Sequence, residues 1–187
     1  MRNWKFIAFQ AKRGRSIKIG DPVDQLALII ATGFGVGFIP FAPGTFGSIL
    51  GLLIAYFLIS VFSPDVILLQ NSIIIVSVII TILGIWASTR AEKIFDQKDA
   101  GQIVLDEVCG QLISFLFIAP YLRRLGGQWI WWGIAGFILF RALDILKPYP
   151  LRELEQVRGG LGVMLDDIIA GLYAAVILSI ALLLITD

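Results

Sequence analysis

The sequence predicts an all-α, polytopic membrane helical bundle with about five spanning helices and one re-entrant, glycine-rich segment. Of its 187 residues, 58% are hydrophobic and only 16% are charged, whereas soluble domains are about 45–50% apolar and about 25% charged. The mean hydropathy is +0.88. Long apolar runs alternate with short charged stretches, which is the pattern of a chain that crosses a membrane several times.

Residues 1–24 are predicted to form a basic N-terminal segment that lies on an anionic membrane surface. The first twenty residues contain no acid and six cations, which are Arg2, Lys5, Lys12, Arg13, Arg15 and Lys18. A plain basic tail is the other interpretation. The segment lacks the apolar core of a signal peptide, so we do not expect its removal. Residues 25–187 are predicted to form a single integral-membrane domain, because no long linker or low-complexity tract interrupts them.

The apolar segment 26–41 contains several glycines and a proline, and it is too short for a straight spanning helix of about 20 residues. We therefore expect it to dip into the membrane and turn back. Non-helical backbone at that depth is tolerated only inside protein or beside a wet cavity. The segment therefore points to a nearby functional site.

Five further apolar stretches predict the spanning helices, namely residues 47–62, 72–91, 108–121, 128–146 and 168–185. Cytoplasmic loops of membrane proteins are enriched in Lys and Arg. With the N-terminus inside, only Arg123 and Arg124 of the 15 basic residues fall outside. This bias places every polar motif described below on the inner face.

Two absences restrict the chemistry. The chain has no histidine and one cysteine, Cys109, which excludes Ser-His-Asp triads, His-ligated metals and an intrachain disulfide. Cys109 has apolar neighbours and no activating base, so we interpret it as a packing residue. The formal net charge of +1 provides no basis for a nucleic-acid partner. Catalysis must therefore use carboxylates, Lys or Arg, hydroxyls, backbone amides or a metal bound through oxygen.

One polar motif, PGTFGS at residues 43–48, directly precedes an apolar helix. Its glycines let the backbone approach a ligand, Thr45 and Ser48 offer hydroxyls, and a helix start presents free N–H groups. Together these features indicate an anion site. The alternative is a plain helix cap formed by Thr45.

Carboxylates gather at three predicted helix ends on the same face. Acids at a helix start are stabilised by the helix dipole, so a purely structural role is one interpretation. Gly110 and Gly171 each follow an acid by four residues, and glycine permits helices to approach closely. We therefore expect the acidic ends to meet. The acids are Asp106, Glu107, Asp144, Asp166 and Asp167.

Carboxylates without histidine indicate a hard cation, and Mg²⁺ is usually shared with a substrate phosphate. Arg141 and Lys147 recur with Asp144 at three-residue spacing, on one side of a helix end. They are suited to hold phosphate oxygens. Composition and spacing thus lead to phosphoryl chemistry on a lipid head group.

The chain closely resembles the phosphatidylglycerophosphatase A family. The resemblance rests on motifs in the family's order, at residues 32–37 (TGFGVG), 43–48 (PGTFGS), 103–111 (IVLDEVCGQ), 140–150 (FRALDILKPYP) and 162–173 (GVMLDDIIAGLY). It implies a multi-pass enzyme of the bacterial cytoplasmic membrane, with its active site facing the cytoplasm. It further implies Mg²⁺-dependent conversion of phosphatidylglycerophosphate, the lipid substrate, to phosphatidylglycerol.

The resemblance also implies roles for particular residues. Five acids become the expected metal-binding and catalytic group, namely Asp106, Glu107, Asp144, Asp166 and Asp167. Four others become expected phosphate contacts, namely Thr45, Ser48, Arg141 and Lys147. Water and an aspartate both remain open as the nucleophile, as do one and two metals.

Two rival functions are weighed against this interpretation. A small membrane transporter or channel would use its acids to line an ion path, and we would then expect acids through the membrane depth or on both sides. A CDP-alcohol phosphotransferase would need a longer spaced pattern of aspartates and glycines, which the sequence does not contain.

Overall fold

The computed structural model describes residues 21–62, 65–122, 129–154 and 156–186. Within these ranges every regular element is a helix, which confirms the predicted all-α class. Most of the predicted basic segment, residues 1–20, lies outside the described residues, as do Arg123 and Arg124.

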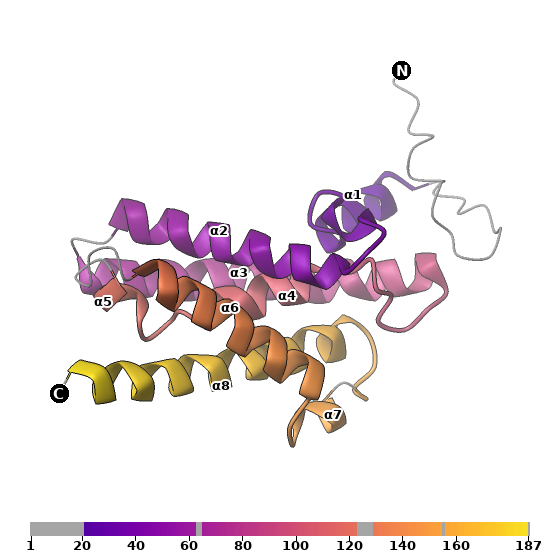
Figure 1. Cartoon of the computed structure of the whole chain (residues 1–187). Helices are drawn as coiled ribbons and strands as arrows, with labels where there is room; N and C mark the ends of the chain where they lie inside the picture. Colours follow the sequence, from indigo (N-terminus) through magenta and orange to yellow (C-terminus); the bar gives the residue numbers. More distant parts are fainter. Residues whose placement is uncertain (1–20, 63–64, 123–128, 155, 187) are drawn as a thin grey trace.

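The first helix, α1 (Pro22–Ala31), is ten residues long and does not reach across a membrane. The side chain of Asp21 accepts a hydrogen bond from the Val23 amide at 2.9 Å and so caps its start. After α1 the chain turns through residues with positive φ and a short 3₁₀ helix, η2 (Val36–Phe38). The next helix then starts at the same end of the bundle (Figure 1). The predicted break in the glycine-rich segment is therefore present, and its re-entry into the membrane stays a prediction.

Among the residues that the structure describes, four helices are long and apolar enough to cross a membrane. These are α2 (Pro43–Phe62), α3 (Val66–Phe95), α6 (Trp129–Leu146) and α8 (Gly160–Thr186). With 30 residues, α3 is about 45 Å long, so it extends beyond a hydrocarbon core of about 30 Å.

The predicted span 108–121 is not one continuous helix. It comprises α4 (Leu105–Ile113), of nine residues, and α5 (Ala119–Leu122), of four. The hydroxyl of Ser114, at the end of α4, donates to the Gln111 carbonyl at 2.6 Å. Every residue of α4 except Glu107 is buried, so α4 is enclosed by its neighbours. In the described part of the chain, the bundle therefore has four candidate spanning helices around a short central one.

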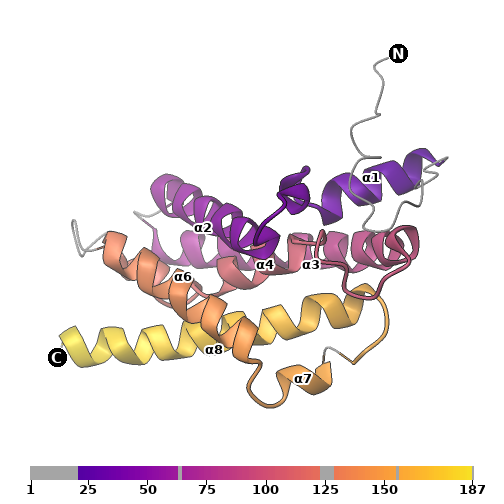
Figure 2. The same cartoon turned by 45° about the vertical axis from the view of Figure 1, so that its right-hand side comes forward.

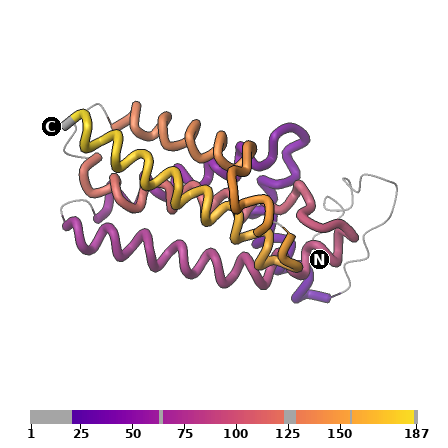
Figure 3. The backbone as a smooth tube through the Cα atoms, turned by 90° about the horizontal axis from the view of Figure 1, so that it is seen from below, coloured from indigo at the N-terminus to yellow at the C-terminus, as the bar shows by residue number. Residues whose placement is uncertain are grey.

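The four long helices share a common polar end. The start of α2, the end of α3, the end of α6 and the start of α8 lie together there, with α1 and α7 (Leu151–Leu154) beside them (Figures 1 and 2). Seen from below, the C-terminus of α8 lies at the opposite end (Figure 3). We call the first of these ends the site end. The common location of the polar motifs agrees with the predicted topology.

Candidate active site

The first acidic pair lies at the start of the central helix. Asp106 and Glu107 occupy the first turn of α4. Val104, the residue just before this helix begins, makes no side-chain hydrogen bond that caps it. Asp106 is only 6% exposed, and Glu107 is half-buried. The positive end of the helix dipole partly offsets their negative charge.

The second acidic pair lies deeper in its helix than the sequence indicated. Because α8 begins at Gly160, Asp166 and Asp167 lie about two turns along it and cannot cap its start. The amide of Gly160 instead donates to the Thr89 hydroxyl of α3 at 2.9 Å. The structural interpretation of these two acids as helix-start residues is therefore wrong. Both are buried.

Two glycines bring the acidic pairs together. A Cβ added to Gly110 would lie 2.5 Å from the carbonyl oxygen of Asp167, and one added to Gly171 would overlap the carbonyl oxygen of Gly110. The backbones of α4 and α8 thus touch where any side chain would separate them. The expected close approach at these glycines is confirmed.

Three of the five acids form one cluster. Asp106, Glu107 and Asp167 each offer a carboxylate oxygen, and these three oxygens lie within 4.8 Å of one another. One oxygen of each residue is buried without a hydrogen-bond partner among the described residues. Ionised carboxylates held this close and away from water repel strongly. An all-oxygen group of this kind is suited to a hard cation such as Mg²⁺.

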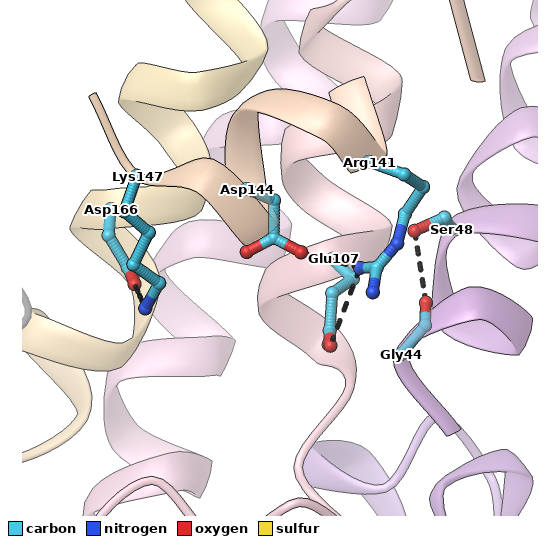
Figure 4. Close-up of polar contacts among 7 residues, drawn as sticks. All are labelled: Gly44, Ser48, Glu107, Arg141, Asp144, Lys147 and Asp166. Carbon is cyan, nitrogen blue, oxygen red and sulfur yellow. Dashed lines mark hydrogen bonds and ion pairs between the residues drawn. The ribbon is translucent and has the colours of Figure 1, made fainter. Parts of the chain in front are cut away.

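The other two acids lie beside the cluster and are engaged by cations. Nη1 of Arg141 lies 2.6 Å from Oδ2 of Asp144 and 3.9 Å from Oε1 of Glu107. Nζ of Lys147 lies 2.7 Å from Oδ2 of Asp166. In Figure 4, Asp144 lies between the two basic side chains. The structure therefore separates the five predicted acids into a cluster of three and two acids, Asp144 and Asp166, that each lie within 2.7 Å of a cation.

The start of α2 borders the same site. Because α2 begins at Pro43, Thr45 is inside the first turn and its amide donates to the Ala42 carbonyl at 2.9 Å. The interpretation of Thr45 as the helix cap is therefore wrong. The Ser48 hydroxyl is buried and donates to the Gly44 carbonyl at 3.0 Å (Figure 4), so it is engaged within its own helix.

Gly44 is a site residue that the sequence prediction missed. A Cβ at this position would overlap Oε1 of Glu107 and lie 3.3 Å from Nη1 of Arg141. The PGTFGS motif therefore touches the acidic cluster through the backbone of its first glycine. The sequence did contain a signal, because glycine has a low helix propensity. A glycine at the second position of a helix therefore indicates that something other than helix formation favours it there.

Comparisons with known proteins show which proteins the chain is similar to. A family model described as phosphatidylglycerophosphatase A matches residues 29–182. A Haemophilus influenzae protein named phosphatidylglycerophosphatase A is 33% identical over 163 residues, which are 84% of this chain and 92% of that protein. The Escherichia coli protein of the same name is 34% identical over 151 residues, 80% of each chain.

A third relative has a different name. A Bacteroides thetaiotaomicron protein, provisionally named a phosphatidylinositol-3-phosphatase, is 40% identical over 159 residues. The match covers 83% of this chain and 93% of that protein. No solved structure was found to match the chain.

Proposed function

The chain belongs to the phosphatidylglycerophosphatase A family, and from this premise we propose that it hydrolyses the terminal phosphate ester of phosphatidylglycerophosphate. The proposed reaction depends on Mg²⁺, occurs at the cytoplasmic face of the bacterial inner membrane and yields phosphatidylglycerol and phosphate. The observation that carries the proposal is the cluster of Asp106, Glu107 and Asp167, whose oxygens lie within 4.8 Å of one another.

Asp106, Glu107 and Asp167 are the residues that would hold the cation. Each has a buried carboxylate oxygen without a hydrogen-bond partner among the described residues, so each has an acceptor available for a metal. When bound, Mg²⁺ supplies positive charge that offsets the charge of the phosphate. The buried carboxylates keep the cation at the site end.

Arg141 and Lys147 would hold the phosphate oxygens. Each is within 2.7 Å of an acid, and a doubly charged phosphate can compete for both cations through charge-assisted hydrogen bonds. The planar guanidinium of Arg141 can bind two phosphate oxygens at once, whereas the ammonium of Lys147 acts as a point charge.

The net reaction consumes one water molecule. A new bond joins the water oxygen to phosphorus, the bond from phosphorus to the glycerol oxygen breaks, and that oxygen takes up a proton. Asp144, between Arg141 and Lys147 (Figure 4), is suited to accept the proton that water loses once Arg141 turns towards the phosphate.

The cytoplasmic orientation is supported by the distribution of cations. Arg90 and Lys93 lie near the end of α3, Arg141 lies near the end of α6, and Lys147 directly follows α6, all at the site end. Positive residues accumulate on the cytoplasmic side of membrane proteins. The substrate head group would then reach the cluster from the cytoplasmic leaflet.

The experiment is phosphate release by the purified chain from three lipids. These are phosphatidylglycerophosphate, phosphatidylinositol 3-phosphate and phosphatidic acid, each assayed with Mg²⁺, with EDTA and after Mg²⁺ is restored. We expect rapid release from phosphatidylglycerophosphate, loss in EDTA and recovery with Mg²⁺. Glu153→Gln, an exposed acid of α7 at the same end, is the matched control and should behave as the unmodified chain.

Two outcomes would contradict the proposal in different ways. Faster release from phosphatidylinositol 3-phosphate would assign the chain the activity in the name of the Bacteroides relative. Full release from phosphatidylglycerophosphate in EDTA would support the proposed substrate but refute the proposed dependence on Mg²⁺.

A further inference from the structure

One side of α3 carries a stripe that changes from apolar to basic, and it is exposed at its isoleucines and at Lys93 and half-buried at Trp86 and Arg90. Its members are three or four residues apart and therefore lie on one side of the helix. The stripe consists of Ile75, Ile79, Ile82, Trp86, Arg90 and Lys93. The three isoleucines are 51–63% exposed, which is expected of side chains that face lipid. The basic residues follow towards the site end.

The dimensions of this stripe match one leaflet of a bilayer. Ile75 and Trp86 are eleven residues apart, so they are separated by about 16 Å along the helix. Half of the hydrocarbon core is about 15 Å. Tryptophan is enriched where hydrocarbon meets the head groups, and Arg90 and Lys93 follow it by one and two turns.

The basic end of the stripe lies in a surface groove of about 840 Å³. Trp86, Thr89, Arg90 and Lys93 line it from α3, and Asp24 contributes from α1, while Ile82 lies at its apolar side. The groove is therefore polar at one end and continuous with the exposed isoleucines at the other.

The charged groups of the groove leave an excess of positive charge. Nη1 of Arg90 lies 2.7 Å from Oδ1 of Asp24, and the guanidinium carbon is 5.8 Å from the centre of the Trp86 ring. These two contacts hold Arg90 in place while using only part of its five donors. Lys93 is exposed and forms no ion pair with any residue that the structure describes.

We propose that this groove binds the head group of an anionic phospholipid. The phosphodiester contacts Arg90 and Lys93, and one acyl chain lies along Ile82, Ile79 and Ile75. The order of apolar, aromatic and basic residues along α3 matches the order of acyl chain, interface and head group in a lipid. None of these residues belongs to the candidate active site, so the inference does not depend on the proposed function.

The test is a lipid titration of the purified full-length protein in detergent, with bound lipids counted by native mass spectrometry. Phosphatidylglycerol is the anionic probe and phosphatidylcholine the zwitterionic one, and neither carries the terminal phosphate ester that the proposed reaction cleaves. We expect tighter binding of phosphatidylglycerol. Lys93→Gln should weaken that binding roughly fivefold, the loss for one surface cation facing an anionic lipid, and leave phosphatidylcholine unchanged.

Arg158→Gln is the matched control, because Arg158 is an exposed cation on the connection to α8, outside the groove. It should not change the binding of either lipid. Equal losses in Lys93→Gln and Arg158→Gln would overturn the proposal in favour of a diffuse electrostatic effect. Equal affinity of the unmodified chain for the two lipids would overturn it as well. Because Lys93 is exposed, Lys93→Gln should leave the thermal midpoint of unfolding unchanged. A change in lipid binding can then be attributed to the lost charge.

Discussion

Gly44 of α2 faces the carboxylate of Glu107 on α4 so closely that a single Cβ would overlap Oε1 of Glu107. The same Cβ would lie 3.3 Å from Nη1 of Arg141. Gly44, the first of the two glycines in the PGTFGS motif, therefore borders the acidic cluster. Its absent side chain leaves the space in which Glu107 and Arg141 are held.

We predict that Gly44→Ala lowers phosphate release by roughly 10²-fold, because Glu107 must move by about 1 Å or more to make room. Gly133→Ala is the matched control, since the nearest atom to a Cβ there is a Leu52 methyl at 4.0 Å. Both changes favour a helix by about 1 kcal/mol. A Gly44→Ala variant with normal turnover would show that the position of Glu107 is not critical.

Asp167→Asn should reduce phosphate release by roughly 10²-fold or more, because it removes one of the three clustered carboxylates and with it a ligand worth about 3 kcal/mol in the transition state. The substitution preserves the size of the side chain, so packing against α4 is retained. Initial rates at saturating Mg²⁺ provide the measurement, with Glu153→Gln alongside. Near-normal rates in Asp167→Asn and Asp106→Asn together would exclude the cluster as the catalytic centre.

Mg²⁺ should stabilise the unmodified chain, because it offsets the repulsion among Asp106, Glu107 and Asp167. At about 100 times its dissociation constant, the gain in unfolding free energy would be about 2.7 kcal/mol. In EDTA, Asp167→Asn should have the higher thermal midpoint, since it carries one repelling charge fewer. Thermal unfolding in detergent with EDTA, Mg²⁺ and K⁺ checks both statements. A midpoint that does not respond to Mg²⁺ would argue against a cation at this cluster.

Cys109→Ala should retain phosphate release within about threefold of the unmodified rate. The thiol is fully buried, lies 3.3 Å from the Thr81 hydroxyl and packs against Met164. Its polar contacts among the described residues are the Thr81 hydroxyl and the Ser77 carbonyl, and neither group is a base or a cation that would activate a thiol. Loss of the small buried side chain should lower stability by roughly 1 kcal/mol. A loss of several orders of magnitude in turnover, with the fold intact, would instead indicate a thiol nucleophile.

Several features of the molecule could be predicted because they depend on local sequence. An apolar run of sufficient length forms a helix that is stable in lipid whatever its neighbours are, and this determines α2, α3, α6 and α8. The charge pattern likewise predicts that their polar ends share one end of the bundle. Gly110 and Gly171 are informative because a missing side chain permits contact between backbones.

Other features depend on which helices are neighbours. The enclosure of α4 by the surrounding helices makes a nine-residue helix sufficient where a spanning helix was expected. At the start of α8, the Gly160 amide donates to the Thr89 hydroxyl of α3, 71 residues earlier in the chain. The pattern of apolar and polar residues in 160–167 cannot predict this contact with a distant part of the chain.

The sequence by itself determined that this chain is a helical membrane protein with acids and cations gathered at one end. Only the tertiary structure decided that Asp106, Glu107 and Asp167 cluster while Asp144 and Asp166 pair with Arg141 and Lys147. The five acids are chemically alike, so composition cannot distinguish them. The distinction arises because the electrostatic energy of a charge depends on its distance from other charges and from water, and packing of the helices sets those distances.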